Sequence, residues 1–349
     1  MRVASICALP FHRWVLQSTV NAFLQQGHEV RHFVHHPAHP QDFLQHTDHR
    51  SFFADVRDFK PDLVLAADYP YDLLRNNCGA PVLATRHGII HKGNGYAPEQ
   101  DQADFIVTWS DWDHRNLDRY GITSPTRIQA GCPWFPHLDV PPAHRRSARE
   151  RQAHRHGIPV HTPTILYAPS HNLHSYDVVF RASQNLPPGV HVIVRPHPVT
   201  LWRNPELPAK LDTLPNVHVQ VDPAHIGPFT ALLAADLLIS DYSSIPYFAL
   251  LVPHASLPII TLPPRTFPFP DSPEATHNPQ LGHEVFDHHS LLQAIDEAID
   301  DDPMLPFRLG LRHTIFQPAL HQHEQDPPFR IASHFQSPKP HALSTPTPF

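Results

Sequence analysis

Short apolar runs rich in β-branched residues alternate with longer amphipathic stretches along this chain, and the alternation breaks off once and then restarts. The pattern is typical of parallel α/β units, in which a helix after each strand returns the chain to the same end of the sheet. Two consecutive sets of units predict an α/β protein with two open parallel sheets. The strands expected in the first set are Val3–Leu9, Glu29–Val34, Asp62–Ala66, Pro81–Thr85, Phe105–Trp109 and Arg127–Ala130. Those expected in the second set are Thr164–Tyr167, His191–Val194, Val217–Val221, Leu237–Ser240 and Pro258–Thr261.

The break in the pattern lies at residues 141–155, where two prolines precede an arginine-rich segment without an apolar face. A chain of 349 residues also exceeds what one hydrophobic core usually supports. We therefore predict an N-terminal domain over residues 1–140, a linker over 141–155 and a C-terminal domain over 156–325. Residues 326–349 are rich in Pro, Ser, Thr and His, which predicts a tail that is disordered at its end. Helices are expected at Trp14–Gln26, Pro228–Ala234 and Ser290–Asp300.

The composition excludes several classes of protein. With 26 Lys and Arg against 33 Asp and Glu, the net charge is −7, the wrong sign for a protein that binds nucleic-acid phosphates. The three cysteines are far apart, so no disulfide framework is expected, and no Cys or carboxylate recurs at the spacing of metal ligands. The N-terminal apolar run is too short for a signal peptide, and prolines interrupt the stretch from Ile245 to Leu262. We expect a cytoplasmic protein without cofactor or metal. Any association with the cell membrane is expected to be peripheral, on its inner face.

The first candidate for chemistry is the loop after the strand that ends near Thr85. Ligands of open parallel sheets bind beyond the carboxyl ends of the strands, so residues directly after strands are the ones to consider. His87 and Gly88 occupy such a position, and Lys92 follows in a chain that has only four lysines. The glycine permits a sharp turn, and the histidine suits a general base. With 32 histidines in the chain, a loop histidine that only caps or packs is an equal alternative.

Two further segments follow expected strands of the second half. Arg195 and His197 alternate with prolines, which places two donors on a rigid backbone and favours a phosphate ligand. The alternative is a buried turn in which Arg195 pairs with an acid. In the other segment a buried strand runs through Asp241 into Ser243 and Ser244 at the start of an apolar helix, where hydroxyl and backbone N–H groups converge. Helix capping uses the same donors as phosphate binding, so both interpretations stay open there.

Together these segments resemble the CDP-glycerol glycerophosphotransferase family of teichoic-acid and capsule polymer enzymes. The matching pieces, within residues 80–262, are the His-Gly loop with Lys92, Tyr167–Ser170, Arg195–Pro198 and Asp236–Ser244. The resemblance implies a GT-B-like fold, with two Rossmann-like domains facing a central cleft, the acceptor on the N-terminal side and the nucleotide on the C-terminal side. It also implies two catalytic histidines, His87 and His197, and a set of substrate-binding residues: Gly88, Lys92, Ser170, Arg195, Asp241, Ser243 and Ser244.

The resemblance leads to a specific reaction as the main expectation. A hydroxyl of a glycan or lipid-linked acceptor attacks the β-phosphorus of a CDP-alditol, His87 takes the proton, and Arg195 and His197 stabilise the leaving CMP. The family often has an aromatic residue and an arginine after the Tyr-Ala-Pro-Ser piece, whereas this chain has His171 and Asn172. The first alternative is a GT-B glycosyltransferase that uses a CMP- or UDP-activated sugar. A non-catalytic nucleotide-binding partner and a sugar-nucleotide epimerase of related fold are the remaining ones.

One motif competes with this interpretation. Asp111 and Asp113 flank Trp112 at the spacing of a metal-binding Asp-x-Asp motif from another class of glycosyltransferase. The motif follows Ser110 at a strand end and opens a helical run, and acids are favourable in the first turn of a helix. We therefore expect these acids to be structural.

Overall fold

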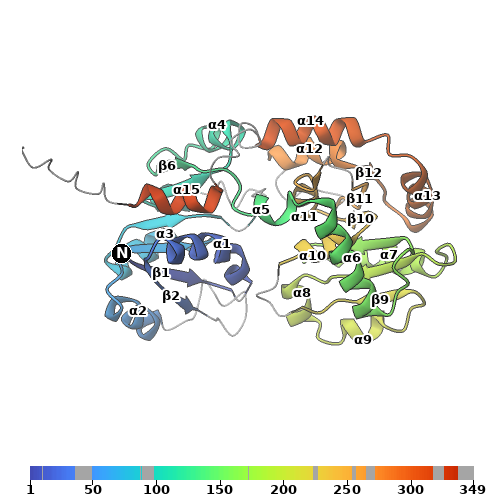
Figure 1. The fold of residues 1–349 in the computed structure, drawn as a ribbon, viewed down its shortest axis with the longest axis horizontal. Coiled ribbons are helices and arrows are strands. Elements are labelled where there is room, and N and C mark those ends of the chain that lie inside the picture. The colour runs from blue at the N-terminus through green and yellow to red at the C-terminus, as the bar shows by residue number, and fades with distance from the viewer. Residues whose placement is uncertain are drawn as a thin grey trace, which may run out of the picture.

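The computed structural model describes residues 1–9, 11–35, 49–86, 88, 98–171, 173–222, 227–253, 257–264, 272–316 and 326–336. It contains two six-stranded parallel sheets, which lie side by side with helices packed around them (Figure 1). The strand orders are β2-β1-β3-β4-β5-β6 in the first sheet and β12-β11-β10-β7-β8-β9 in the second. The two open α/β sheets expected from the alternating pattern are thus confirmed.

The first sheet contains the six strands that the sequence predicted in the first half of the chain. They are β1 (Arg2–Cys7), β2 (Glu29–Val34), β3 (Leu63–Ala66), β4 (Val82–Ala84), β5 (Phe105–Thr108) and β6 (Thr126–Gln129). The inner strands β3 and β4 are buried along their whole length, because helices cover both faces of a parallel sheet. The helices of this half are α1 (His12–Gln25), α2 (His49–Asp58), α3 (Tyr71–Cys78) and α4 (Asp111–Arg119), with a 3-10 helix at Pro98–Gln102.

The second sheet contains the five strands predicted in the second half and one more. They are β7 (Thr164–Tyr167), β8 (His191–Val194), β9 (Val217–Val219), β10 (Leu237–Ser240), β11 (Ile259–Thr261) and β12 (His283–Glu284). The edge strand β12 has two residues and no apolar run, so hydrophobic periodicity did not indicate it. Gly282 before it lies so close to the Ile259 backbone that a Cβ atom would stand 1.9 Å from the carbonyl oxygen. The helices of this half are α7 (His174–Ser183), α8 (Pro198–Arg203), α9 (Leu207–Leu211), α10 (Phe229–Ala234), α11 (Ile245–Ala249), α12 (Pro273–Leu281), α13 (His288–Asp300) and α14 (Leu305–Phe316).

The chain crosses between the sheets through α5 (Phe135–Leu138) and α6 (Pro142–His156), the latter covering most of the segment expected to be a linker. Helix α6 packs against α10 of the second half. Arg149 of α6 donates a hydrogen bond to the carbonyl oxygen of Thr162 at 2.8 Å and forms an ion pair with Asp236. Within the described residues, no helix combines the length and apolar character needed to cross a bilayer.

The C-terminal segment contains a helix that the sequence did not predict. Helix α15 (Pro327–His334) lies against α1 of the first domain (Figure 1). Phe335 contacts Phe105 and Phe23, with ring centroids 5.0 and 6.2 Å apart. The segment is rich in proline, so the few apolar residues that pack here did not stand out as a helical pattern. Residues 337–349, predicted to form the disordered end of the tail, lie outside the described residues.

One apolar cluster runs from the first sheet into the second. It includes Val3 and Leu65 of the first sheet and Leu166 and Leu238 of the second. Where the halves meet, the cluster is aromatic: Trp134 lies edge-on to Phe248, with ring centroids 5.3 Å apart. The two halves are therefore packed against each other through aromatic side chains, at the same place where the carboxyl ends of their strands meet.

Candidate active-site cleft

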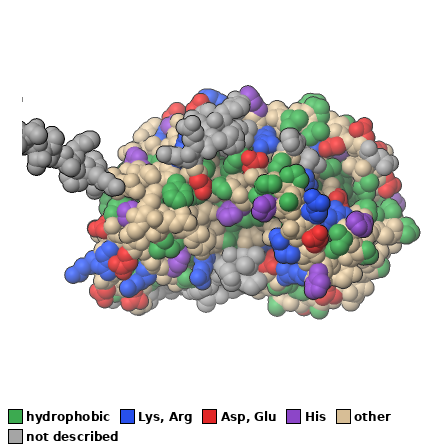
Figure 2. Space-filling view, in the orientation of Figure 1, with side chains coloured by type: hydrophobic (Ala, Val, Ile, Leu, Met, Phe, Trp, Pro, Cys, Tyr) green, Lys and Arg blue, Asp and Glu red, His purple; other side chains and the backbone are tan. Residues whose placement is uncertain are grey.

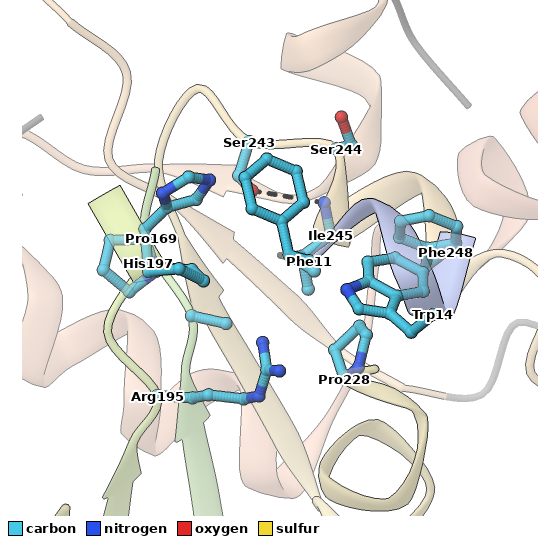
Figure 3. A pocket seen from close by; sticks show the side chains of 12 residues that line it. Phe11, Trp14, Pro169, Arg195, His197, Pro228, Ser243, Ser244, Ile245 and Phe248 are labelled. Carbon is cyan, nitrogen blue, oxygen red and sulfur yellow. Dashed lines mark hydrogen bonds between the residues drawn. The ribbon is translucent and has the colours of Figure 1, made fainter. Parts of the chain in front are cut away.

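A pocket of about 660 Å³, including the part open to solvent, lies between the two halves of the chain. The first half contributes Phe11 and Trp14, which follow β1 at the start of α1 (Figure 3). The second half contributes the loops after β7, β8 and β10 and the segment before α10. The residues from these loops are Ala168, Pro169, Arg195, His197, Pro198, Pro228, Ser243, Ser244, Ile245 and Phe248. Four predicted site residues, Arg195, His197, Ser243 and Ser244, are thus brought together.

Arg195 forms the cationic wall of the pocket. Its side chain is 13% exposed, and its Nε donates to Oδ2 of Asp222 at 3.3 Å. Burial lowers the pKa of Arg195, and the Asp222 carboxylate offsets part of that effect. The arginine is therefore paired with an acid and also lines the pocket, and its binding of a phosphate stays a prediction.

His197 is oriented by the first turn of α8. Its Nδ1 accepts a hydrogen bond from the backbone N–H of Val199 at 3.1 Å, so a neutral ring carries its proton on Nε2. In that tautomer Nε2 is a donor, which suits a phosphate oxygen better than a proton to be abstracted. The ring of Phe11 meets the imidazole edge to face, with centroids 5.9 Å apart. The histidine is thus packed by a residue of the other half.

Ser243 and Ser244 differ in what their hydroxyl groups do. Ser243 Oγ accepts from the backbone N–H of Ile245 at 3.3 Å, which is a local cap (Figure 3). Ser244 is the N-cap residue of α11, and its side chain makes no capping hydrogen bond. Helix α11 is five residues long, so the hydroxyl and backbone groups here matter more than a helix dipole. Both serines line the pocket, and a ligand there would compete with the cap for Ser243 Oγ.

Ser170 and Asp241 were predicted to contact substrate, but neither lines the pocket. Asp241 is 1% exposed and accepts hydrogen bonds from the backbone N–H of Ser170 at 2.6 Å and from its hydroxyl at 3.0 Å. A third donor is Ser175 Oγ at 3.1 Å. The carboxylate therefore ties the loop after β10 to the loop after β7, and these residues support the pocket from behind.

The predicted general base, His87, and Lys92 lie outside the described residues. Gly88 is described and buried, and it does not line the pocket. Arg86, which precedes this loop, has a left-handed backbone with φ of 54° and is fully buried. It forms an ion pair with Asp113 and donates to the Val107 carbonyl at 3.0 Å. This anchor could not be found from the sequence, because nothing in the local pattern marks a buried arginine.

The same ion pair explains the Asp-x-Asp motif. Asp113 is buried against Arg86, whereas Asp111 accepts a hydrogen bond from Gln129 at 3.0 Å on the surface. The two carboxylates therefore serve different contacts. In the part of the chain that the structure describes, no three His, Cys, Asp or Glu residues are arranged to hold a metal ion.

Three aromatic residues of the pocket were missed from the sequence: Phe11, Trp14 and Phe248. Phe11 and Trp14 lie just after the first strand, so the rule that selected the loops after the other strands could have found them. Phe248 lies one turn into an apolar helix and looks like any core residue. Only the fold brings it opposite Trp14, with ring centroids 6.3 Å apart.

Comparison with known proteins finds similarity in structure and not in sequence. No family model and no curated protein sequence matches the chain. The UDP-GlcNAc 2-epimerase of Methanocaldococcus jannaschii, solved with UDP-GlcNAc and UDP, superposes with a TM-score of 0.62 at 14% identity, covering 96% of this chain and 99% of that one. Anabaena HepE, solved with UDP-glucose, has a TM-score of 0.55 at 11% identity, covering 96% and 98%. The spinosyn rhamnosyltransferase SpnG has a TM-score of 0.52 at 16% identity, covering 90% and 95%.

These similarities define the class of fold. The two parallel sheets with their helices match the GT-B-like architecture of these proteins, in which two Rossmann-like domains face a central cleft. The fold expected from the sequence is thus confirmed. The more particular resemblance to the CDP-glycerol family stays a prediction.

Proposed function

We propose that this chain is a GT-B glycosyltransferase that takes a sugar from a CMP- or UDP-activated donor. The observation that carries the proposal is that Arg195, His197 and Ser244 line the same pocket between the domains. A cation, an N–H donor and a hydroxyl at the carboxyl ends of parallel strands match the oxygens of a nucleotide phosphate. Structural neighbours that were solved with UDP or UDP-sugars support the choice of ligand class.

The proposed reaction assigns each group a task. The acceptor oxygen bonds to the anomeric carbon of the sugar, and the bond from that carbon to the donor phosphate oxygen breaks with its electron pair leaving on the phosphate. Arg195 and the Nε2–H of His197 stabilise the charge that grows there. His87, on the loop after β4, takes the proton of the acceptor hydroxyl. Gly88 and Lys92 belong to the same loop and are proposed to shape the acceptor side.

Glycerol-phosphate transfer from a CDP-alditol is the second candidate. The Arg-Pro-His-Pro piece at Arg195–Pro198 and the Asp-Tyr-Ser-Ser piece at Asp241–Ser244 favour it, through the resemblance described above. The same donors would bind the pyrophosphate, but the acceptor would attack phosphorus instead of carbon. A glycan or lipid-linked acceptor at the inner face of the membrane belongs to this candidate.

A donor screen tests the proposal. Thermal unfolding is followed with UDP-sugars, CMP-sugars, CDP-glycerol and CDP-ribitol, because a ligand at about 100 times its dissociation constant stabilises by about 2.7 kcal/mol. We expect a shift with at least one nucleotide-sugar and a smaller shift in Arg195→Ala. Phosphorus NMR of the product then separates the candidates, since only alditol-phosphate transfer makes a phosphodiester. A donor that is altered without any acceptor would indicate an epimerase, and no shift with any donor would contradict the proposal.

A further inference from the structure

One carboxylate behind the pocket receives donors from three side chains. Asp222 lies just beyond β9, and its side chain is 5% exposed. Oδ1 accepts from Arg155 Nη1 at 2.7 Å, whereas Oδ2 accepts from Gln220 Nε2 at 2.5 Å and from Arg195 Nε at 3.3 Å. Burial raises the pKa of Asp222, but the hydrogen bonds of Gln220 and Arg155 and the charges of Arg195 and Arg155 outweigh this and hold it below the ordinary value. The group is therefore ionised at neutral pH.

This contact determines which part of Arg195 is presented to the pocket. A guanidinium group is planar, and fixing its Nε fixes the direction of its two terminal nitrogens. Figure 3 shows the guanidinium extending from the loop after β8 toward Pro228 and Phe11. Asp222 contacts the group at its Nε edge.

The same carboxylate connects the pocket to the segment that joins the domains. Arg155 lies in the last turn of α6, which follows the crossing from the first half to the second. Figure 2 shows Lys and Arg side chains gathered over the region of α6. Arg155 is itself 43% exposed, whereas the Asp222 side chain that it contacts is almost fully covered.

We propose that Asp222 is a positioning residue that aims Arg195 at the phosphate of the nucleotide ligand and ties this aim to α6 through Arg155. The proposal rests on the proposed function of the pocket. Its alternative is that Asp222 only neutralises buried positive charge. The two accounts predict opposite changes in nucleotide affinity when Asp222 is neutralised. A negative charge behind a phosphate site repels the phosphate, so neutralising Asp222 should tighten binding if the carboxylate does not position Arg195.

Calorimetric titration with UDP and CDP tests the proposal on the full-length chain. Asp222→Asn removes the charge and keeps the shape, and Asp222→Glu keeps the charge but moves the carboxylate by one methylene. We expect both variants to bind the nucleotide about tenfold or more weakly, a typical loss for one charged hydrogen bond. Asp118→Asn, which removes an exposed partner of Arg127, is the matched control and should bind like wild type.

A double-mutant cycle provides a measurement that a purely structural role of Asp222 would not affect. In an Arg195→Ala background, Asp222→Asn should change affinity less than about twofold, because the group that it aims is gone. Binding by Asp222→Asn as tight as wild type or tighter, with Asp222→Glu unchanged, would overturn the proposal while leaving the pocket's function intact. Wild-type protein that binds neither nucleotide would instead overturn the proposed function, and this inference with it. Should Asp222→Asn not fold, the cycle is run with Asp222→Glu.

Discussion

The indole of Trp14, at the start of α1 in the first domain, stands at 89° to the ring of Phe229 in the second, with ring centroids 5.5 Å apart. Phe248 and Trp134 surround the same indole. Trp14 thus takes part in the aromatic contact between the domains and also lines the pocket.

Replacing Trp14 with alanine should destabilise the chain by about 3 kcal/mol, the low end for removing a large packed aromatic side chain. Urea unfolding measures the change. Trp202→Ala is the matched control, because Trp202 is 42% exposed and should cost much less. Equal losses in the two variants would mean that the aromatic contact of Trp14 between the domains adds no more stability than an exposed tryptophan does.

The buried ion pair of Arg86 and Asp113 predicts a large effect from a single neutralisation. Asp113→Ala leaves the guanidinium uncompensated in a fully buried place, which should cost about 3–5 kcal/mol in the free energy of unfolding. Asp118→Ala breaks the pair with Arg127 and should cost far less, since the Asp118 carboxylate is exposed and solvent screens its charge. A small loss in Asp113→Ala would show that the pair is not a structural anchor of the loop that begins after β4.

The two serines of the pocket should respond differently to substitution. Ser243→Ala removes a cap and should lower stability by about 1 kcal/mol, with little change in nucleotide affinity. Ser244→Ala should weaken nucleotide binding by about ten- to a hundredfold, the loss expected for one hydrogen bond to a charged group. Titration of both variants with UDP checks this, and unchanged affinity in Ser244→Ala would restrict the phosphate site to Arg195 and His197.

A group of histidines under the end of α6 predicts a pH dependence of stability. Burial lowers the pKa of His218 below its ordinary 6.5, the positive charges of His191 and His156 lower it further, and Asp212 opposes them. Burial also lowers the pKa of His156, with Arg155 adding to the shift and Asp222 among the opposing groups.

Because the unfolded chain takes up protons that the folded chain resists, the free energy of unfolding should fall as the pH drops below about 6.5. Above that pH these histidines should contribute no slope. Urea unfolding between pH 5 and pH 8 measures the dependence, and His218→Gln should flatten it. A slope of the same size in the variant would assign the dependence to other groups.

The strands and the pocket loops could be predicted from the sequence because both depend on local order. A strand such as Leu237–Ser240 is marked by its own apolar residues, and the loop that lines the pocket comes directly after the strand in the chain. Contacts between residues that are far apart in the chain leave no such local pattern in the sequence. Asp222 meets Arg155 across 67 positions of the chain, and only the fold places this carboxylate beside the pocket arginine.

Calorimetric titration of UDP into wild-type protein and Arg195→Ala tests the central claim most directly. If the cleft binds a nucleotide through its phosphates, the wild-type chain should bind UDP, and the variant should bind it at least about tenfold more weakly because it has lost its charged donor. Binding of equal strength in both proteins, or binding in neither, would contradict the assignment of this cleft as a nucleotide site.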